Sequence, residues 1–233
     1  GAERGRRGVS TPPTKPNANL VELQGEALEF FQQRGISAQT LEECGVKQEN
    51  DVFCPAVGRK VPWAIAFPYY RGGEIVNIKY RTLDKQFWQV KGAEKILYGL
   101  DEVEGKDEIV VVEGEIDKLS LHEAGITNTV SVPDGAPPKV SSEEGVPTPD
   151  QDKKYSYLWN SREVLDMAIK VTLATDNDTP GQALCEELAR RLGKERCYRV
   201  RWPTCRGDTL SSEGTGLSAE DTRPLEEEPD SGE

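Results

Sequence analysis

Several features common in other proteins are absent or scarce in this sequence, and each absence excludes a class of protein. The five cysteines are scattered without a CxxC pair, which argues against a zinc ribbon and favours free thiols in a reducing compartment. The single histidine, His122, lies in a predicted helix, where we expect a surface position. No apolar run approaches the ~20 residues that span a bilayer, so no membrane partner is expected. No GxxxxGKS or GxxxxGKT stretch occurs, which excludes a P-loop ATPase within this sequence.

The composition is that of a globular protein with two polar ends. The 233 residues are 30% charged and 36% hydrophobic with a net charge of −12, enough for one domain with a small companion. Residues 1–19 are rich in Gly, Pro and Arg, and residues 204–233 are strongly acidic. Both segments are therefore predicted to be disordered. The arginines near the start fit either the remnant of an organelle transit segment or the edge of a fragment.

Two acidic stretches, VVVEGEID (110–117) and VTLATDNDTPG (171–181), each follow an apolar, β-branched run. Such runs are typical of buried parallel strands, which deliver the following side chains to one end of a sheet. We therefore expect Glu113, Asp176 and Asp178 to meet. Three carboxylates brought together repel one another unless a cation lies between them, and hard oxygen ligands suit Mg²⁺ or Mn²⁺. The alternative is that Glu113 caps a helix and the Asp-Asn-Asp stretch forms a turn.

The segment Lys60–Leu100 is the most basic of its size, with seven bases against three acids. Its basic residues are interleaved with Tyr80, Phe87 and Trp88. Basic side chains can follow a phosphate backbone while aromatic side chains stack on nucleobases. The alternative is a solvated β-meander with Trp88 in the core.

The remaining pattern predicts a mostly parallel sheet flanked by helices, an α/β fold with ligands at the carboxyl ends of its strands. Helical periodicity and turn residues place the elements as follows. We expect two short helices within Leu20–Cys44, a hairpin within Val61–Tyr80, helices at Ile116–Ala124, Tyr155–Ala168 and Thr179–Leu192, and strands at Thr127–Val132 and Cys197–Trp202.

The stretches EGEID (113–117) and DNDTPG (176–181) resemble the acidic motifs of the Toprim domain, which primases, topoisomerases and some nucleases share. The surrounding stretches VPDGAP (132–137), KGAEKILYGLDEV (91–103) and ATDNDTPGQALCEELARRLG (174–193) resemble one branch more closely. That branch is the phage-type primase-helicase known in organelles as Twinkle, particularly its plant form. The likeness runs from about Leu20 to Pro203.

The resemblance implies a small α+β basic subdomain at residues 20–104 and a Toprim domain at residues 105–203. It implies metal-dependent ribonucleotidyl transfer on single-stranded DNA in organellar replication, with Glu113 catalytic and Mg²⁺ or Mn²⁺ held by Glu113, Asp176 and Asp178. The expected partners are single-stranded DNA, ribonucleoside triphosphates, and a replicative helicase or DNA polymerase, in the mitochondrion, the chloroplast or both. The residues expected to bind nucleic acid or nucleotide are Lys79, Arg81, Lys85, Lys91 and Lys95.

Two alternatives stay open beside an active primase. The family's zinc ribbon, helicase domain and third acidic motif are not found in this sequence, where Asp208 is a poor substitute for the third acid. A catalytically weakened single-stranded DNA-binding or regulatory module would fit these departures. A phosphatase of the haloacid dehalogenase type would use Asp176-Asn177-Asp178-Thr179 as its DxDxT-like nucleophile loop, but in those enzymes this loop opens the domain, and here it lies near the end.

Overall fold

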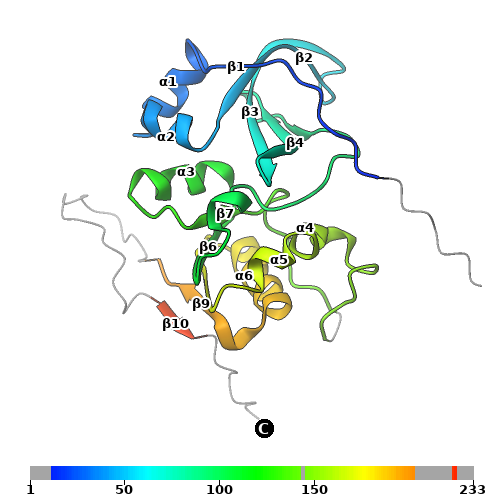
Figure 1. Ribbon diagram of the computed structural model, residues 1–233, viewed down its shortest axis with the longest axis vertical. Helices are drawn as coiled ribbons and strands as arrows, with labels where there is room; N and C mark the ends of the chain where they lie inside the picture. The colour runs from blue at the N-terminus through cyan, green and yellow to red at the C-terminus, as the bar shows by residue number, and fades with distance from the viewer. Residues whose placement is uncertain (1–11, 143–144, 203–221, 225–233) are drawn as a thin grey trace, which may run out of the picture.

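The computed structural model describes residues 12–142 and 145–202, together with the backbone of residues 222–224. It contains two sheets with helices packed around and between them (Figure 1). No helix among the described residues is long and apolar enough to cross a membrane. The predicted combination of a mostly parallel sheet flanked by helices and a smaller α+β part is confirmed.

The first sheet is antiparallel, in the order β1-β2-β3-β4-β5. Two short helices, α1 and α2, precede most of it, as the sequence predicts, and Gly45 ends the second with a positive φ of 65°. The predicted hairpin turns at Gly72 and Gly73, which both have positive φ. The elements are β1 (Leu20–Val21), α1 (Glu26–Gln32), α2 (Ala38–Glu43), β2 (Lys47–Cys54), β3 (Arg59–Arg71), β4 (Glu74–Arg81), β5 (Phe87–Gln89) and the 3-10 turn η1 (Leu100–Val103).

The second sheet has the order β10-β9-β8-β6-β7, with β9, β8, β6 and β7 mutually parallel. Its elements are β6 (Glu108–Val112), α3 (Glu115–Glu123), β7 (Thr129–Ser131), η2 (Lys153–Tyr155), α4 (Ser156–Asn160), α5 (Arg162–Leu165), β8 (Lys170–Leu173), α6 (Thr179–Leu192), η3 (Lys194–Arg196), β9 (Cys197–Val200) and β10 (Thr222–Pro224). Their boundaries agree closely with the predicted ones, except that the helix expected over Tyr155–Ala168 is divided at Ser161. This residue is fully buried, and its hydroxyl accepts a hydrogen bond from the Leu97 amide at 3.2 Å.

One hydrophobic cluster packs the first sheet against α3 of the second part. It joins Phe31 and Tyr69 of the first part to Tyr98 and to Leu119 of α3. The rings of Tyr69 and Tyr98 lie 5.3 Å apart between centroids. This packing fixes α3, and with it the carboxyl end of β6, against the face of the antiparallel sheet.

Both ends of the chain contain local structure that polar composition did not predict. Residues 12–19 run extended along the first sheet (Figure 1), where the Thr14 amide donates to Gly92 O at 2.8 Å. Strand β10, inside the segment expected to be disordered, pairs antiparallel with β9. Backbone hydrogen bonds of this kind require no apolar periodicity, so composition does not reveal them. Residues 1–11, 203–221 and 225–233 lie outside the described residues, as does Asp208.

Candidate functional site

The carboxyl ends of β6 and β8 meet, as the sequence predicts. These strands are parallel neighbours, with Val111 paired to Leu173. Glu113 follows β6, and its Oε1 accepts a hydrogen bond of 2.8 Å from the backbone amide of Asp176, which follows β8. The two acidic motifs are therefore joined directly at one edge of the sheet.

Asp178 is the residue that caps a helix, a role that the alternative interpretation of the sequence gave to Glu113. It is the N-cap of α6, and its Oδ1 accepts from the Gly181 amide at 2.8 Å. Glu113, in contrast, is not a helix cap, because Gly114 occupies that position of α3 without a side-chain hydrogen bond. At Gly181 a Cβ atom would overlap both Glu113 Oε1 and the Asp176 carbonyl oxygen. Glycine is thus what allows α6 to begin so close to Glu113.

A fourth carboxylate, Asp117 of α3, belongs to the same edge and was not among the predicted site residues. Partial dehydration and the negative charge of Asp176 raise its pKa to about 6. Dehydration also raises the pKa of Glu113. The hydrogen bond from the Asp176 amide lowers this pKa, and the negative charges of Asp176, Asp178 and Asp117 raise it further. The signal for Asp117 was its place in the same acidic motif, since it is the last residue of the stretch EGEID (113–117). Glu113, Asp117, Asp176 and Asp178 are called the acidic edge below.

The side chains of the acidic edge are not drawn tightly together. Among the described residues, the group of potential metal ligands whose donor atoms all lie within 4.8 Å of one another is Cys44, Glu102 and His122. That group lies elsewhere, between α2, η1 and α3, and Lys118 Nζ donates into it at 2.9 Å to Cys44 Sγ and 2.5 Å to Glu102 Oε2. A lysine ammonium therefore already supplies the positive charge there.

A cleft of about 700 Å³ opens beside the acidic edge. One side is formed by Gly114, Glu115 and Ile116 at the start of α3, and another by the loop at Pro133–Gly135. The opposite side is the antiparallel sheet, from which β4, β5 and the following loop contribute four of the five predicted binding residues. These four are called the basic wall below: Lys79, Arg81, Lys91 and Lys95.

Strand alternation decides which side chains of the basic wall face the cleft. In the β4–β5 pairing, Lys79 lies opposite Gln89, and Arg81 lies opposite Phe87. The intervening pair, Tyr80 and Trp88, faces the other way and forms a stacked contact with 5.2 Å between ring centroids. Phe87 therefore lies next to Arg81 on the cleft side, and it is 52% exposed. It is the one of the three aromatic residues that remains placed to stack on a nucleobase.

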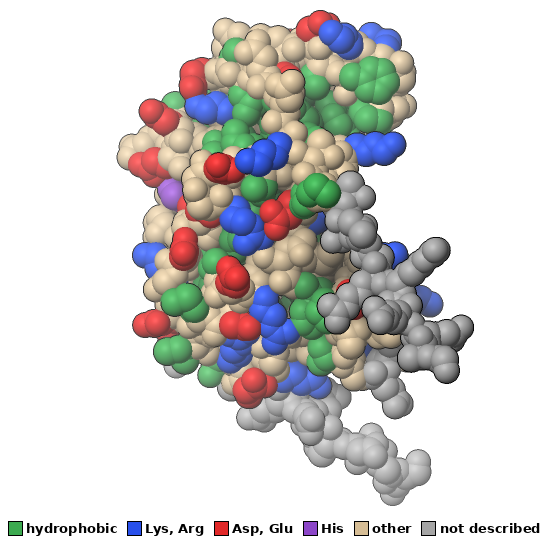
Figure 2. All heavy atoms as spheres, turned by 45° about the vertical axis from the view of Figure 1, so that its right-hand side comes forward, with side chains coloured by type: hydrophobic (Ala, Val, Ile, Leu, Met, Phe, Trp, Pro, Cys, Tyr) green, Lys and Arg blue, Asp and Glu red, His purple; other side chains and the backbone are tan. Residues whose placement is uncertain are grey.

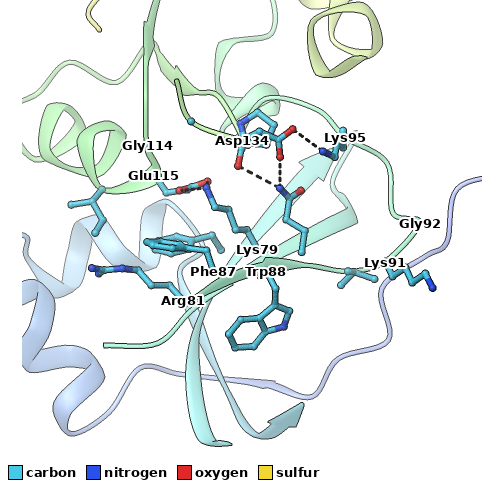
Figure 3. Close-up of a pocket in the computed structure, with 16 residues that line it drawn as sticks. Lys79, Arg81, Phe87, Trp88, Lys91, Gly92, Lys95, Gly114, Glu115 and Asp134 are labelled. Atoms are coloured by element: carbon cyan, nitrogen blue, oxygen red, sulfur yellow. Dashed lines mark hydrogen bonds and ion pairs between the residues drawn. The ribbon is translucent and has the colours of Figure 1, made fainter. Parts of the chain in front are cut away.

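Lys79 and Lys95 already have anionic partners across the cleft (Figure 3). Lys79 Nζ lies 2.9 Å from Oε1 of Glu115, which also accepts from the Tyr69 hydroxyl at 2.5 Å, and all three are largely buried. Lys95 Nζ lies 2.7 Å from Asp134 Oδ2. These two lysines connect the antiparallel sheet to α3 and to the loop after β7.

Arg81 differs from both lysines. Its side chain is 5% exposed, yet its buried Nε and NH1 atoms have no hydrogen-bond partner among the described residues. The guanidinium lies 4.4 Å from the ring centroid of Phe30 and 5.5 Å from that of Phe87. Burial lowers its pKa, with Arg34 acting in the same direction and Glu115 opposing. A buried, incompletely bonded guanidinium beside a cleft is suited to bind an anion.

The last two predicted binding residues are exposed. Lys91 lies at the far end of the cleft in Figure 3. Lys85 is in the turn between β4 and β5, with a positive φ of 64°, and does not line the cleft. On the face drawn in Figure 2, acidic and basic side chains alternate over the described residues. The basic character is therefore a property of the cleft rather than of that surface.

Comparisons with known proteins agree with this geometry. Residues 107–201 match the Toprim domain family. The chain is 50% identical over 190 residues to a chloroplastic/mitochondrial Twinkle homolog of Arabidopsis thaliana, and 48% identical over 190 residues to a primase homolog of the same plant. Both matches cover 82% of this chain, but 26% of the first relative and 54% of the second.

Among solved structures, the chain resembles the primase fragment of the bacteriophage T7 primase-helicase, with a TM-score of 0.60 and 25% identity over 84% of this chain and 74% of that one. A second T7 structure, with a TM-score of 0.58 and 25% identity, covers 80% of this chain and 82% of that one. It contains the phage lagging-strand DNA polymerase with primase domains of two gp4 subunits bound to an RNA/DNA hybrid and dTTP. Residues 107–201 are therefore a Toprim domain, and the chain as a whole is similar to Twinkle-like primase-helicases of the phage type.

Proposed function

We propose that this chain joins ribonucleotides on a single-stranded DNA template, as the nucleotidyl-transfer core of a DNA primase. The comparisons support a DNA primase-related function, and the step from there to catalysis rests on one observation. One cleft is lined on one side by Arg81 and on the other by Gly114 and Glu115, which directly follow Glu113 of the acidic edge in the sequence. Reaction at a triphosphate requires both a place for divalent cations and a cationic surface for phosphate groups.

The acidic edge fits a divalent cation by its chemistry. Toprim domains are generally dependent on divalent metal, and the donors here are all carboxylate oxygens, which suit Mg²⁺ or Mn²⁺. Burial raises the pKa of Glu113 and Asp117, and the charges of neighbouring carboxylates add to the rise; a bound cation would relieve that repulsion. Glu113, Asp176 and Asp178 would hold the ion. Once bound, it would supply positive charge against the triphosphate and the attacking hydroxyl.

The remaining steps belong to side chains of this chain. Arg81 would hold a phosphate group through its free Nε and NH1 atoms, and Phe87 would stack on a base beside it. Lys91 would contact the template backbone where the cleft opens. Glu113, whose pKa is raised, is the residue that we assign to catalysis, as acceptor of the proton that the attacking hydroxyl loses.

The proposal extends to partners and location. The T7 polymerase complex motivates a replicative DNA polymerase or helicase as the partner of this chain. The name of the Arabidopsis Twinkle homolog motivates the mitochondrion, the chloroplast or both as its location.

A single-stranded DNA-binding or regulatory module is the second candidate. It is favoured by one observation: the carboxylates that the sequence predicted to hold a metal do not form a compact group within 4.8 Å, and two of them accept backbone hydrogen bonds. The comparisons favour primase relatives over the phosphatase alternative.

Incorporation of labelled ribonucleotides on single-stranded DNA, with Mg²⁺ or Mn²⁺, separates the two candidates. A primase core incorporates label in the parent and loses it in Glu113→Gln. Template binding without any incorporation, in both metals and at high nucleotide concentration, would leave only the binding module.

A further inference from the structure

A second polar cluster lies behind the cleft, where α2, η1 and α3 meet. Lys118 of α3 is fully buried, and Cys44, which caps the end of α2, is 4% exposed. Lys118 Nζ lies 2.9 Å from Cys44 Sγ and 2.5 Å from Glu102 Oε2. The lysine and the cysteine belong to different sheet units, so this contact crosses between the two halves of the protein.

The nitrogen–sulfur separation is short for a hydrogen bond to sulfur. A distance of 2.9 Å is typical of an N–H···O bond, with a mode of about 2.9–3.0 Å, and sulfur is both larger and a weaker acceptor than oxygen. The two atoms are thus held in closer approach than their weak attraction explains. Such enforced proximity is what accelerates a reaction between two groups.

The surroundings supply a proton acceptor but argue against a metal. Glu102 contacts the ammonium directly, and His122 Nδ1 lies 3.7 Å from the same carboxylate oxygen. A metal ion held by Cys44, Glu102 and His122 would have to displace a lysine that has no exposed surface. The cluster is therefore arranged for chemistry between Lys118 and Cys44 rather than for coordination.

We propose that Cys44 and Lys118 form a reversible covalent N–O–S bridge when the protein meets hydrogen peroxide. Two Nζ–H bonds of the ammonium and the Sγ–H bond break, one of the two nitrogen hydrogens leaving as the released proton, and one peroxide oxygen forms new bonds to both nitrogen and sulfur. Overall, the ammonium, the thiol and two molecules of hydrogen peroxide give the bridge, three molecules of water and one proton. Nitrogen and sulfur together lose the four electrons that the two peroxides accept. Glu102 takes the released proton and passes it to water.

The bridge would lock the two halves of the cleft together. Cys44 follows α2 of the antiparallel part, and Lys118 lies one turn beyond Glu115, whose partner Lys79 belongs to the basic wall. Burial raises the pKa of the Cys44 thiol to about 11, against the opposing effect of Lys118, so the reaction is slow and needs sustained oxidant. This inference is independent of whether the chain makes primers.

The test is peptide mass spectrometry of the whole chain after exposure to hydrogen peroxide, with free thiols blocked before digestion. We expect one peptide that joins Cys44 to Lys118, heavier than the two reduced peptides together by one oxygen less two hydrogens, and its release by dithiothreitol. Cys185→Ser, which removes another buried thiol, should leave this peptide unchanged, while Cys44→Ser should abolish it.

A thermal measurement provides a second readout, because Lys118 variants risk misfolding. Peroxide should raise the melting temperature of the parent by about 5–10 °C, as a cross-link of a long loop does, and dithiothreitol should reverse the rise. Cys44→Ser should show no such rise. A joined peptide without the added oxygen, sulfinic acid at an unlinked Cys44, or an unmodified Cys44 would each overturn the proposal.

Discussion

The basic wall of the cleft and the neighbouring acidic edge differ in how their charges are balanced. Two lysines of the basic wall form ion pairs within the chain, with Glu115 and Asp134. In the acidic edge, burial and the negative charge of neighbouring carboxylates instead raise the pKa of Glu113 and of Asp117. A stretch that looks strongly basic in sequence is thus partly neutralised in the fold, and Arg81 and Lys91 remain as its main contribution to binding an anion. Charge counted along a sequence overstates what a surface offers to a ligand.

The largest expected effect concerns the structural role of Lys79. In Lys79→Met the buried Glu115 keeps, within the described part of the chain, Tyr69 as its one direct side-chain partner, and breaking a buried ion pair in this way costs about 3–5 kcal/mol. Urea unfolding measures the loss. The matched control is Lys60→Met, whose pair with Asp51 is exposed on both sides and contributes less than about 1 kcal/mol. An equal loss of unfolding free energy in the two variants would show that the ion pair between Lys79 and Glu115 does not stabilise the fold.

Next in size is the metal dependence of the acidic edge. Mn²⁺ at about 100 times its dissociation constant should stabilise the parent by about 2.7 kcal/mol. Asp176→Asn/Asp178→Asn should lose that gain, while its stability without metal stays the same or rises because repulsion is removed. Asp107→Asn/Glu108→Gln, at the opposite end of β6, is the control and should respond like the parent. Undiminished Mn²⁺ stabilisation of the first variant would place the metal elsewhere.

Replacing Arg81 should weaken the binding of single-stranded DNA without lowering the stability of the fold. Arg81→Met removes a buried guanidinium whose Nε and NH1 lack partners, so the free energy of unfolding should not fall. Its affinity for single-stranded DNA should fall about tenfold, and the slope of affinity against salt should flatten by about 1. Fluorescence anisotropy over a salt series measures both quantities. Lys85→Ala, outside the cleft, should bind like the parent, and an equal loss there would show that the cleft is not the binding surface.

The smallest expected effect is the pH dependence at Asp117. Its folded pKa of about 6 exceeds the ordinary value of 3.8, so the native state is penalised when the carboxyl ionises above pH 6, and the penalty disappears as pH falls toward 3.8. Asp117→Asn should therefore be more stable than the parent at neutral pH and equally stable in acid. Because Asp117 is solvent exposed, the gain should stay below about 1 kcal/mol. Melting curves across this pH range test the sign.

Much of this architecture was predictable because the signals were local. The apolar runs before Glu113 and Asp176, the Gly72-Gly73 turn and Pro180 at the start of α6 each identify an element without tertiary information. The meeting of Glu113 with Asp176 followed from the geometry of parallel strands.

What the sequence could not show depends on contacts between distant segments. Lys79 appears as a free cation until Glu115, 36 positions away, is brought beside it. Tyr80 and Trp88 appear available for stacking until strand pairing places them on the far face. The break at Ser161 reflects its bond to Leu97, and β10 is stabilised by β9. Asp117 carried a usable signal that the prediction missed, because it ends the acidic stretch EGEID that begins with Glu113.

The central claim is that the basic wall and the acidic edge form one site. A double-mutant cycle between Arg81→Met and Asp176→Asn tests it most directly, with the affinity for a ribonucleoside triphosphate in Mn²⁺ as the measured quantity. If both residues act on the same bound triphosphate, the two losses should be non-additive, with a coupling free energy of about 0.5–3 kcal/mol. Losses that add within about 0.3 kcal/mol, or an affinity that neither substitution changes, would contradict the claim.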